Sequence, residues 1–165
     1  MPVPTDAFLA GMRRLAAGVT IVTTELDDVW AGLTATSVCS LTAAPPRLLA
    51  CINRDAEAHD LIARRGAFAI NVLTVAHRDL ADRFGGRDDV FGPERFVPEQ
   101  WDVGVLGLPL LVGAAALFQC RLVRSVAVGS HSIFIGEVEA MGPEGDGEPL
   151  VYHERGYHRL GPLPP

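Results

Sequence analysis

The sequence predicts a mainly β protein with flanking helices, in which short strands form a barrel or a sandwich. Several apolar or β-branched runs are separated by turns rich in Gly and Pro. Only a few segments have helical spacing, which favours these two architectures over a parallel α/β sheet. In addition, no Gly-x-Gly-x-x-Gly turn occurs in a βαβ rhythm, and this argues against a Rossmann dinucleotide site.

Three helices are predicted. The first starts at Thr5 or Asp6 and ends near Gly18, with apolar residues at helical spacing. These apolar residues are Phe8, Leu9, Met12, Leu15 and Ala16. Two further helices are expected at residues 56–65 and 74–84, and each is followed by a glycine that can end it.

Strands are predicted where β-branched and apolar residues concentrate. They are expected at residues 19–24, 29–36, 38–41, 48–52, 68–73, 117–128, 133–140 and 150–153. Pro45 and Pro46 cannot donate ladder hydrogen bonds, so a loop is expected before the strand at 48–52. Residues 85–100 are polar and interrupted by Gly and Pro, and we expect a mobile loop there that could act as a lid.

Composition limits the function classes. The 165 residues suffice for one domain, and 48% hydrophobic against 21% charged residues argues against disorder. A net charge of −6 argues against a nucleic-acid surface. No apolar run is long enough to span a membrane, and the N-terminus lacks a signal segment, so we expect a cytoplasmic protein. Cys39, Cys51 and Cys120 are expected to be reduced thiols, without a disulfide or a metal.

The segment Gly32 to Arg54 is the most informative stretch of the chain. Thr34, Thr36, Ser37 and Ser40 offer hydroxyl groups within an apolar run of small residues. Hydroxyls and backbone amides can contact the edge of a flat ring or a phosphate without adding charge. The segment therefore suggests a cofactor cradle, although a strand of small residues packed close to a neighbour would have the same composition.

A phosphate site is suggested at Asn53, Arg54 and Asp55, which follow a strand and open a helix. Helix N-termini attract phosphate through unpaired amides, and Arg54 can add a bidentate contact. The competing interpretation is that Asp55 caps the helix and pairs with His59.

Two groups of aromatic and imidazole side chains occur later in the chain. His131, at a strand mouth, could contact a dinucleotide, or it could be an ordinary turn residue. The segment 152–159 contains Tyr157 and could stack on a nicotinamide or adenine ring, or seal a barrel edge. His153, Glu154 and His158 lack a matching ligand pair upstream, so no metal site is predicted.

The order of several short motifs resembles the flavin reductase domain family, over roughly residues 7 to 160. The first motifs are Gly18-Val-Thr-Ile-Val-Thr-Thr24, Gly32-Leu-Thr-Ala-Thr-Ser37, Pro45-Pro46, Cys51-Ile-Asn-Arg54, His59 and Gly66-x-Phe-x-Ile-Asn-Val-Leu73. The later ones are Leu80-Ala-x-x-Phe-Gly85, Gly107-x-Pro109, Gly129-Ser-His-x-Ile-Phe-Ile-Gly-Glu-Val138 and Pro149-Leu-Val-Tyr152. Each motif alone is weak, whereas their joint order is specific.

The resemblance implies an FMN-binding split β-barrel that reduces flavin with NADH or NADPH. It implies a homodimer that supplies reduced FMN or FAD to a flavin-dependent monooxygenase, as one domain at 7–160 with a tail at 161–165. By position, the flavin would contact Thr34, Ala35, Thr36, Ser37, Ser40, Leu41, Asn53, Arg54, Asp55, His59, Phe84 and Gly85. His131 and Tyr157 would face the nicotinamide dinucleotide, and no catalytic acid or base is required.

Two positions depart from the family pattern. Serines often follow the Asn-Arg pair, whereas this chain has Asp55-Ala56-Glu57-Ala58, which adds two carboxylates beside the expected phosphate. An Asp often precedes the two prolines, and here it is replaced by Ala44. A second hypothesis is therefore a non-catalytic split barrel that carries or senses flavin or haem. A third is an oxidase resembling pyridoxamine-phosphate oxidase, although its basic substrate-binding residues are not evident.

Overall fold

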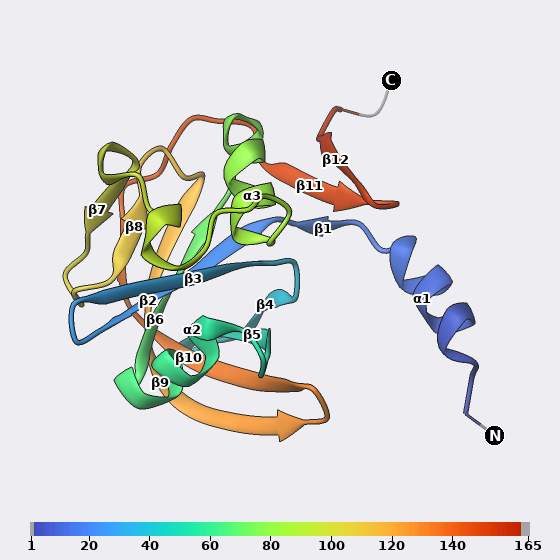
Figure 1. The fold of residues 1–165 in the computed structure, drawn as a ribbon, viewed down its shortest axis with the longest axis horizontal. Helices are drawn as coiled ribbons and strands as arrows, with labels where there is room; N and C mark the ends of the chain where they lie inside the picture. The colour runs from blue at the N-terminus through green and yellow to red at the C-terminus, as the bar shows by residue number, and fades with distance from the viewer. Residues whose placement is uncertain (1, 163–165) are drawn as a thin grey trace.

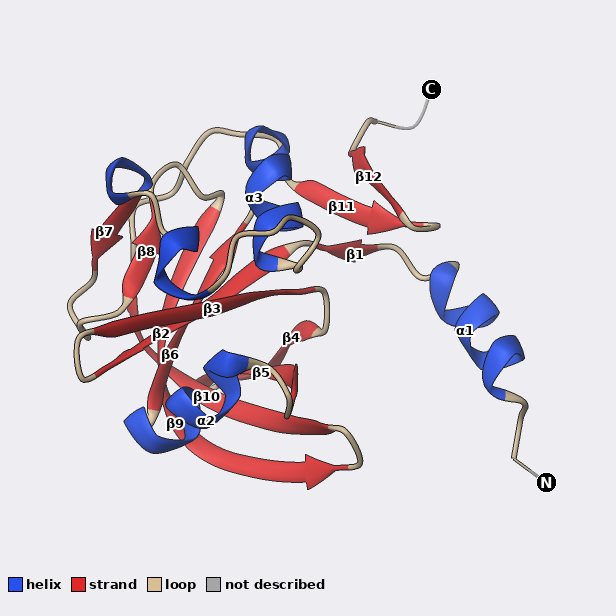
Figure 2. Cartoon of the chain, in the orientation of Figure 1, coloured by secondary structure: helices blue, strands red, loops and turns tan. Residues whose placement is uncertain are grey.

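The computed structural model describes residues 2–162 and confirms a mainly β fold arranged as a split barrel (Figures 1 and 2). An antiparallel sheet of seven strands has the order β3-β2-β6-β9-β10-β5-β4. Its strands are β2 (Thr20–Leu26), β3 (Val29–Ala35), β4 (Val38–Ala43), β5 (Pro46–Asn53), β6 (Ala67–Val72), β9 (Ala116–Val128) and β10 (His131–Met141). β3 and β4 follow one another in the chain yet form opposite edges, so the sheet curls without closing.

The described residues also form two smaller sheets and three α-helices. The smaller sheets comprise β1 (Ala17–Gly18), β11 (Leu150–His153) and β12 (Gly156–Arg159), and β7 (Trp101–Val103) with β8 (Pro109–Leu111). The helices are α1 (Thr5–Arg13), α2 (Glu57–Arg65) and α3 (Arg78–Phe84). Among the residues that the structure describes, no helix is both long and apolar enough to cross a membrane.

Alternation along the central strands divides the core into two clusters. On β2, Ile21 joins the cluster packed with α3, whereas Val22 faces the barrel interior. On β6, Ala69 and Ile70 divide in the same way. Because successive side chains point to opposite faces of a strand, both faces of the central sheet are buried. This explains why neither β2 nor β6 shows a simple alternation of apolar and charged residues.

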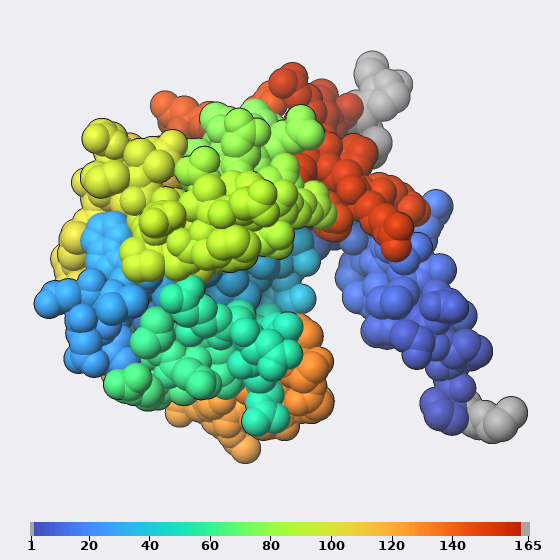
Figure 3. Space-filling view, viewed as in Figure 1, coloured from blue at the N-terminus to red at the C-terminus, as the bar shows by residue number. Residues whose placement is uncertain are grey.

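Helix α1 is shorter than predicted and stands apart from the barrel (Figures 1 and 3). Its described residues include none that is buried, although the spacing of Phe8, Leu9 and Met12 is that of a packed helix. Phe8 is 58% exposed and Leu15, just beyond the helix, is 63% exposed. The predicted apolar stripe therefore exists but is not buried, because Leu9, Met12 and Leu15 only line an open hollow between α1 and the β11–β12 hairpin.

The other two helices and the prolines differ from prediction in detail. Gly66 ends α2 with φ 71°, as predicted. Thr74 does cap the next segment through a capping box with His77, but a 3-10 turn at Val75–His77 precedes α3. β5 begins at Pro46, inside the expected loop, because the first residue of a strand can lack a donor.

The interpretation of residues 85–100 as a mobile loop is wrong for its second half. Two 3-10 turns, Gly92–Arg95 and Pro98–Gln100, occur there, and Phe96 is buried. Phe96 packs against Phe84 and Trp101, with ring centroids 4.9 Å away in both pairs. Because the rest of the segment is mostly polar, its composition did not indicate that Phe96 would be buried. Of the predicted tail at 161–165, residues 163–165 lie outside the described residues.

Candidate functional site

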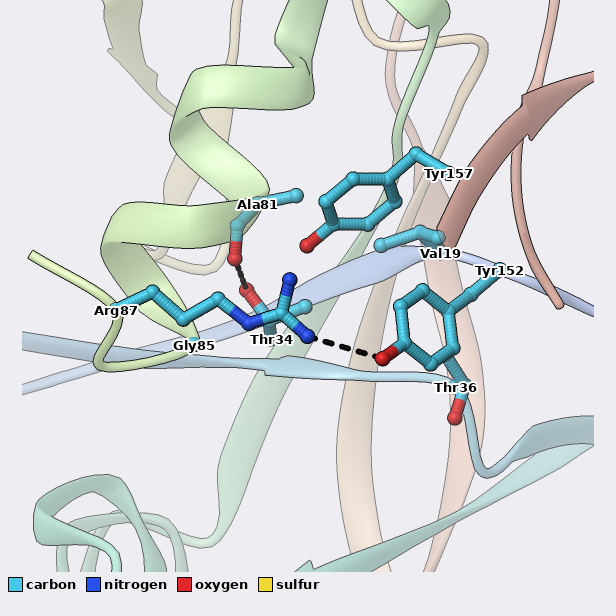
Figure 4. A pocket seen from close by; sticks show the side chains of 8 residues that line it. All are labelled: Val19, Thr34, Thr36, Ala81, Gly85, Arg87, Tyr152 and Tyr157. Atoms are coloured by element: carbon cyan, nitrogen blue, oxygen red, sulfur yellow. Dashed lines mark hydrogen bonds between the residues drawn. The ribbon is translucent and has the colours of Figure 1, made fainter. Parts of the chain in front are cut away.

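A cavity of about 190 Å³ lies where the end of β3 meets α3 and the β11–β12 hairpin (Figure 4). Its lining is polar at one end and aromatic at the other. The lining residues are Val19, Thr34, Thr36, Ala81, Gly85, Arg87, Tyr152 and Tyr157. We call this the ring cavity, and it brings together four of the predicted site residues: Thr34, Thr36, Gly85 and Tyr157.

Small residues allow β3 to approach α3 closely beside this cavity. A Cβ atom on Gly32 would lie 3.1 Å from the Phe84 ring and 3.0 Å from the Val22 carbonyl oxygen. The Thr34 hydroxyl donates a hydrogen bond of 2.8 Å to the Ala81 carbonyl. Close packing of a small-residue strand is thus present at Gly32, and the hydroxyls that follow it still line a cavity. The packing interpretation is therefore confirmed at Gly32, whereas the cofactor cradle at Thr34 and Thr36 stays a prediction.

Arg87 reaches across the ring cavity toward two tyrosines (Figure 4). Its guanidinium donates 3.0 Å and 2.9 Å hydrogen bonds to the Asp82 carboxylate and the Tyr152 hydroxyl. The guanidinium carbon lies 5.6 Å from the ring centroids of both Tyr152 and Tyr157. The Tyr157 hydroxyl donates to the same Asp82 oxygen at 3.1 Å. Four side chains from three segments therefore hold one another in place.

Burial and the neighbouring Asp82 carboxylate raise the pKa of Tyr157 to about 12, so its phenol keeps its proton well into the alkaline range. The Tyr152 and Asp82 hydrogen bonds raise the pKa of Arg87. Arg87, Asp82 and Tyr152 are not among the site residues predicted from the sequence. The available signals were the Gly85-Gly86 pair before Arg87 and the spacing of the two tyrosines across a hairpin.

A second cavity, of about 400 Å³, lies at the carboxyl end of β5, and we call it the arginine cavity. Its lining residues are Arg54, Asp55, His59, Asp60, Gly129 and Ser130. The β5–β10 register places His131 opposite Asn53, and the Arg54 backbone amide donates to the Ser130 carbonyl at 2.9 Å. The two motifs at 53–55 and 129–131, far apart in sequence, thus form one site.

His59 is buried and uses both ring nitrogens within the protein. Nε2 lies 2.9 Å from the Ser132 hydroxyl, and Nδ1 lies 2.8 Å from the Asp60 carboxylate. His59 therefore connects α2 to the start of β10. The interpretation that Asp55 caps α2 and pairs with His59 is wrong, because Ala56 occupies the cap position without a side-chain bond.

Carboxylates outnumber arginines in the lining of the arginine cavity. Arg54 is exposed, and its guanidinium makes only a long contact of 3.5 Å to the Gly129 carbonyl. Asp55 and Asp60 line the same cavity, whereas Glu57 is paired with Arg95 at 2.9 Å. Of the two carboxylates that depart from the family pattern, Glu57 is therefore neutralised by Arg95. Asp55 is the one that lines the arginine cavity.

The backbone links the two cavities, because the Ser37 carbonyl accepts a 2.9 Å hydrogen bond from the Cys51 amide, two residues before Asn53. Other predicted residues lie elsewhere. Ser40 lines a separate apolar groove of about 470 Å³, and the neighbouring Leu41 is 48% exposed. Ala35 and Phe84 are buried in the core, so their side chains pack and do not line either cavity.

His131 and Tyr157, both predicted to face a nicotinamide dinucleotide, line different regions of the structure. His131 is exposed beside the arginine cavity, where its Nδ1 lies 2.9 Å from the Ser130 hydroxyl. Tyr157 lines the ring cavity. Within this chain they do not converge on one surface.

Curated relatives resemble the chain over almost its whole length. The FMN reductase (NADH) RutF of Stutzerimonas stutzeri is 45% identical over 159 residues, which is 96% of this chain and 90% of that protein. The FMN reductase (NADH) RutF of Ancylobacter novellus is 40% identical and covers 96% of this chain and 87% of its own length.

Solved structures agree in fold. BorF, the flavin reductase component of a bacterial two-component tryptophan halogenase, superposes with a TM-score of 0.88 at 30% identity, covering 97% of this chain and 100% of BorF. The NADH:FAD oxidoreductase SgcE6 of Streptomyces globisporus superposes with a TM-score of 0.87 at 28% identity, covering 98% of each chain.

The family model described as "Flavin reductase like domain" matches residues 12–161, which include both cavities and the β11–β12 hairpin. With relatives of 40% identity and more along nearly the full length, the match extends well beyond isolated motifs. The chain belongs to the flavin reductase like domain family.

Proposed function

We propose that this protein is an NADH-dependent FMN reductase that supplies reduced flavin to a partner monooxygenase, acting through one domain at residues 7–160. The observation that carries the proposal is the pair of cavities at the ends of β3 and β5. One offers neutral hydroxyls and aromatic rings, and the other offers Arg54. These are the surfaces that a flat ring system with a phosphate tail requires.

The residues present fit a flavin. A Cβ atom on Gly85 would lie 2.9 Å from the Ala81 carbonyl and 3.9 Å from Thr34, so a side chain there would crowd the ring cavity. Thr34 and Thr36 can meet a ring edge without adding charge. Arg54, beside the Asn53 turn, can meet the phosphate end.

The bound flavin would supply the electron acceptor, taking a hydride from the reduced nicotinamide. The chain's own residues would position the two partners. Tyr152 and Tyr157 meet edge to face with centroids 5.3 Å apart and form the aromatic wall of the ring cavity. Because Tyr157 remains a phenol at neutral pH, it presents a hydrogen-bonding group and an apolar ring, and it adds no charge to the wall.

FMN and NADH are preferred in this proposal because the curated relatives are named for them. The name of SgcE6 pairs NADH with FAD, so FAD is the competing flavin. A partner enzyme that consumes reduced flavin is supported by BorF, which is the reductase component of a two-component system.

We also propose a homodimer, with α1 packing on the second copy. A nine-residue helix without buried residues is marginal in water by itself. The groove that Ser40 lines is bordered by apolar side chains of Val38, Leu48, Val72, Phe118 and Val138. It offers a matching apolar surface for Phe8 and Met12. Light scattering after chromatography should give twice the chain mass for the wild type and the chain mass for the double variant Phe8→Asp, Met12→Asp.

The activity is tested by mixing the purified protein with NADH or NADPH and with FMN, FAD or riboflavin, and by following loss of the reduced-nicotinamide absorbance. We expect flavin-dependent oxidation that is fastest with NADH and FMN. Absence of oxidation above the protein-free blank would contradict the proposal. A tightly retained yellow chromophore without turnover would instead support the non-catalytic carrier.

A further inference from the structure

We propose that Arg87 binds the pyrophosphate of the nicotinamide dinucleotide at the mouth of the ring cavity, exchanging its contact with Asp82 for the ligand's phosphate oxygens. This inference rests on the proposed function, because it names the group that receives the anionic part of NADH.

The position of Arg87 is the first argument. Figure 4 shows its side chain extended across the ring cavity, between Thr34 on one side and the tyrosines on the other. Of the eight residues that line this cavity, Arg87 alone carries a positive charge. A dinucleotide whose nicotinamide lies against the flavin must place two phosphate charges near this cavity, and a guanidinium can bind them with two parallel hydrogen bonds.

The accessibility of the Arg87 side chain to water is the second argument. Its backbone is anchored, since the Arg87 amide donates to the Asp82 carbonyl at 3.0 Å after the turn at Gly86, where φ is 70°. The side chain is 49% exposed, and the Asp82 side chain is 31% exposed. Ion pairs that are this accessible to water contribute little, so an incoming pyrophosphate can replace the single carboxylate oxygen.

The aromatic rings supply the third argument. Tyr152 and Tyr157 both lie within cation–π range of the guanidinium and would keep it at the cavity mouth while its anionic partner changes. Asp82 would keep its hydrogen bond from Tyr157 after the exchange. The cluster is therefore preorganised around a charge that it does not fully neutralise.

Other arginines in the neighbourhood have different partners. Arg83 pairs with Asp88 at 3.2 Å and does not line the ring cavity. Arg159 faces Glu148 at 3.6 Å, and Arg155 lines a hollow beside α1. Arg83 is thus a suitable control, because it is close in sequence and is likewise paired with an aspartate, with a side chain that is 30% exposed against 49% for Arg87.

The test compares Arg87→Gln with Arg83→Gln. For R87Q we expect the KM for NADH to rise roughly tenfold, the effect of losing one charge-assisted contact. The kcat at saturating NADH should fall far less than the KM rises, and the KM for FMN should change less than the KM for NADH. Calorimetric titration with NAD⁺ should show the same weakening, and R83Q should match the wild type in all these measurements.

The reverse change strengthens the test. Asp82→Asn keeps an acceptor for Tyr157 and removes the competing charge, so it should lower the KM for NADH. Equal NADH KM values and equal NAD⁺ affinities for R87Q and R83Q would overturn the inference. So would an R87Q protein that loses FMN affinity and keeps its NADH KM. If the wild type oxidises no NADH, the proposed function fails, and the NAD⁺ titration still decides whether Arg87 binds the dinucleotide.

Discussion

The ring cavity and the arginine cavity are each lined by one arginine, but the groups around that arginine differ. In the first, Arg87 is held between two tyrosines and an aspartate, and neutral hydroxyls form the rest of the polar lining. In the second, Arg54 is exposed and shares its cavity with Asp55 and Asp60. The one cation of the ring cavity is thus opposed by a single carboxylate, that of Asp82. At the arginine cavity one cation works against two carboxylates, which suits a flavin that exchanges with solvent.

The largest effect on ligand binding is expected at Arg54, the arginine of the arginine cavity. Replacing Arg54 with Ala should weaken FMN binding roughly tenfold or more, because a charge-assisted contact to phosphate is lost. Riboflavin, which has no phosphate, should bind the variant and the wild type alike. Arg64→Ala is the control, because Arg64 lies on α2 and reaches Asp27 at 3.6 Å, away from the cavity. Unchanged FMN affinity, measured by flavin fluorescence quenching, would place the phosphate elsewhere.

Gly32→Ala tests the close approach of β3 and α3. The added Cβ would meet the Val22 carbonyl and the Phe84 ring, so we expect a loss of about 1–3 kcal/mol in unfolding free energy. Urea denaturation measures this loss. Gly11→Ala is a suitable control, since a Cβ there meets no atom within 4 Å. If G32A is as stable as G11A, the packing of this strand is looser than described.

Removing the Asp55 carboxylate should increase the affinity of the arginine cavity for a phosphate group. Asp55→Asn leaves the backbone turn at Asn53 in place and removes one of the two acidic groups in the arginine cavity. We expect FMN to bind a few-fold more tightly, with riboflavin unchanged, because exposed charges interact weakly. Raising the salt concentration should reduce the gain. An equal gain for riboflavin would mean that the carboxylate acts on the ring and not on the phosphate.

The smallest effect is expected from the pH dependence of stability. The pKa of Tyr157 is raised to about 12 in the folded protein, above the value of 10.0 of a free phenol. The folded state therefore holds the proton where the unfolded state loses it, and stability falls as the pH rises from about 10 to 12. Burial also raises the pKa of Cys120 to about 12, so the measurement compares the wild type with Tyr157→Phe, which keeps that thiol. The variant should show the shallower decline.

Local patterns were sufficient to predict most elements and half of the ring cavity. Strands such as β6 and β9 are rich in apolar and β-branched residues, and Gly66 ends α2 as its position indicates. The contacts of Arg87 could not be predicted, because Tyr152 lies 65 residues further along the chain and meets it only through the packing of β11 beside α3. Trp101 and Phe96 are similar, since each anchors a segment whose neighbours are polar or glycine-rich.

The ion pair between Arg95 and Glu57 connects the segment that follows Arg87 to helix α2. Arg95 is nearly buried, lies 5.2 Å from the Phe84 ring centroid and grips the first turn of α2, just after Arg54. The segment that carries Arg87 is thus tied at its far end to the helix that borders the arginine cavity. If dinucleotide binding shifts that segment, α2 is displaced as well and the affinity for flavin changes. Bound flavin must then change the affinity for the dinucleotide by the same factor.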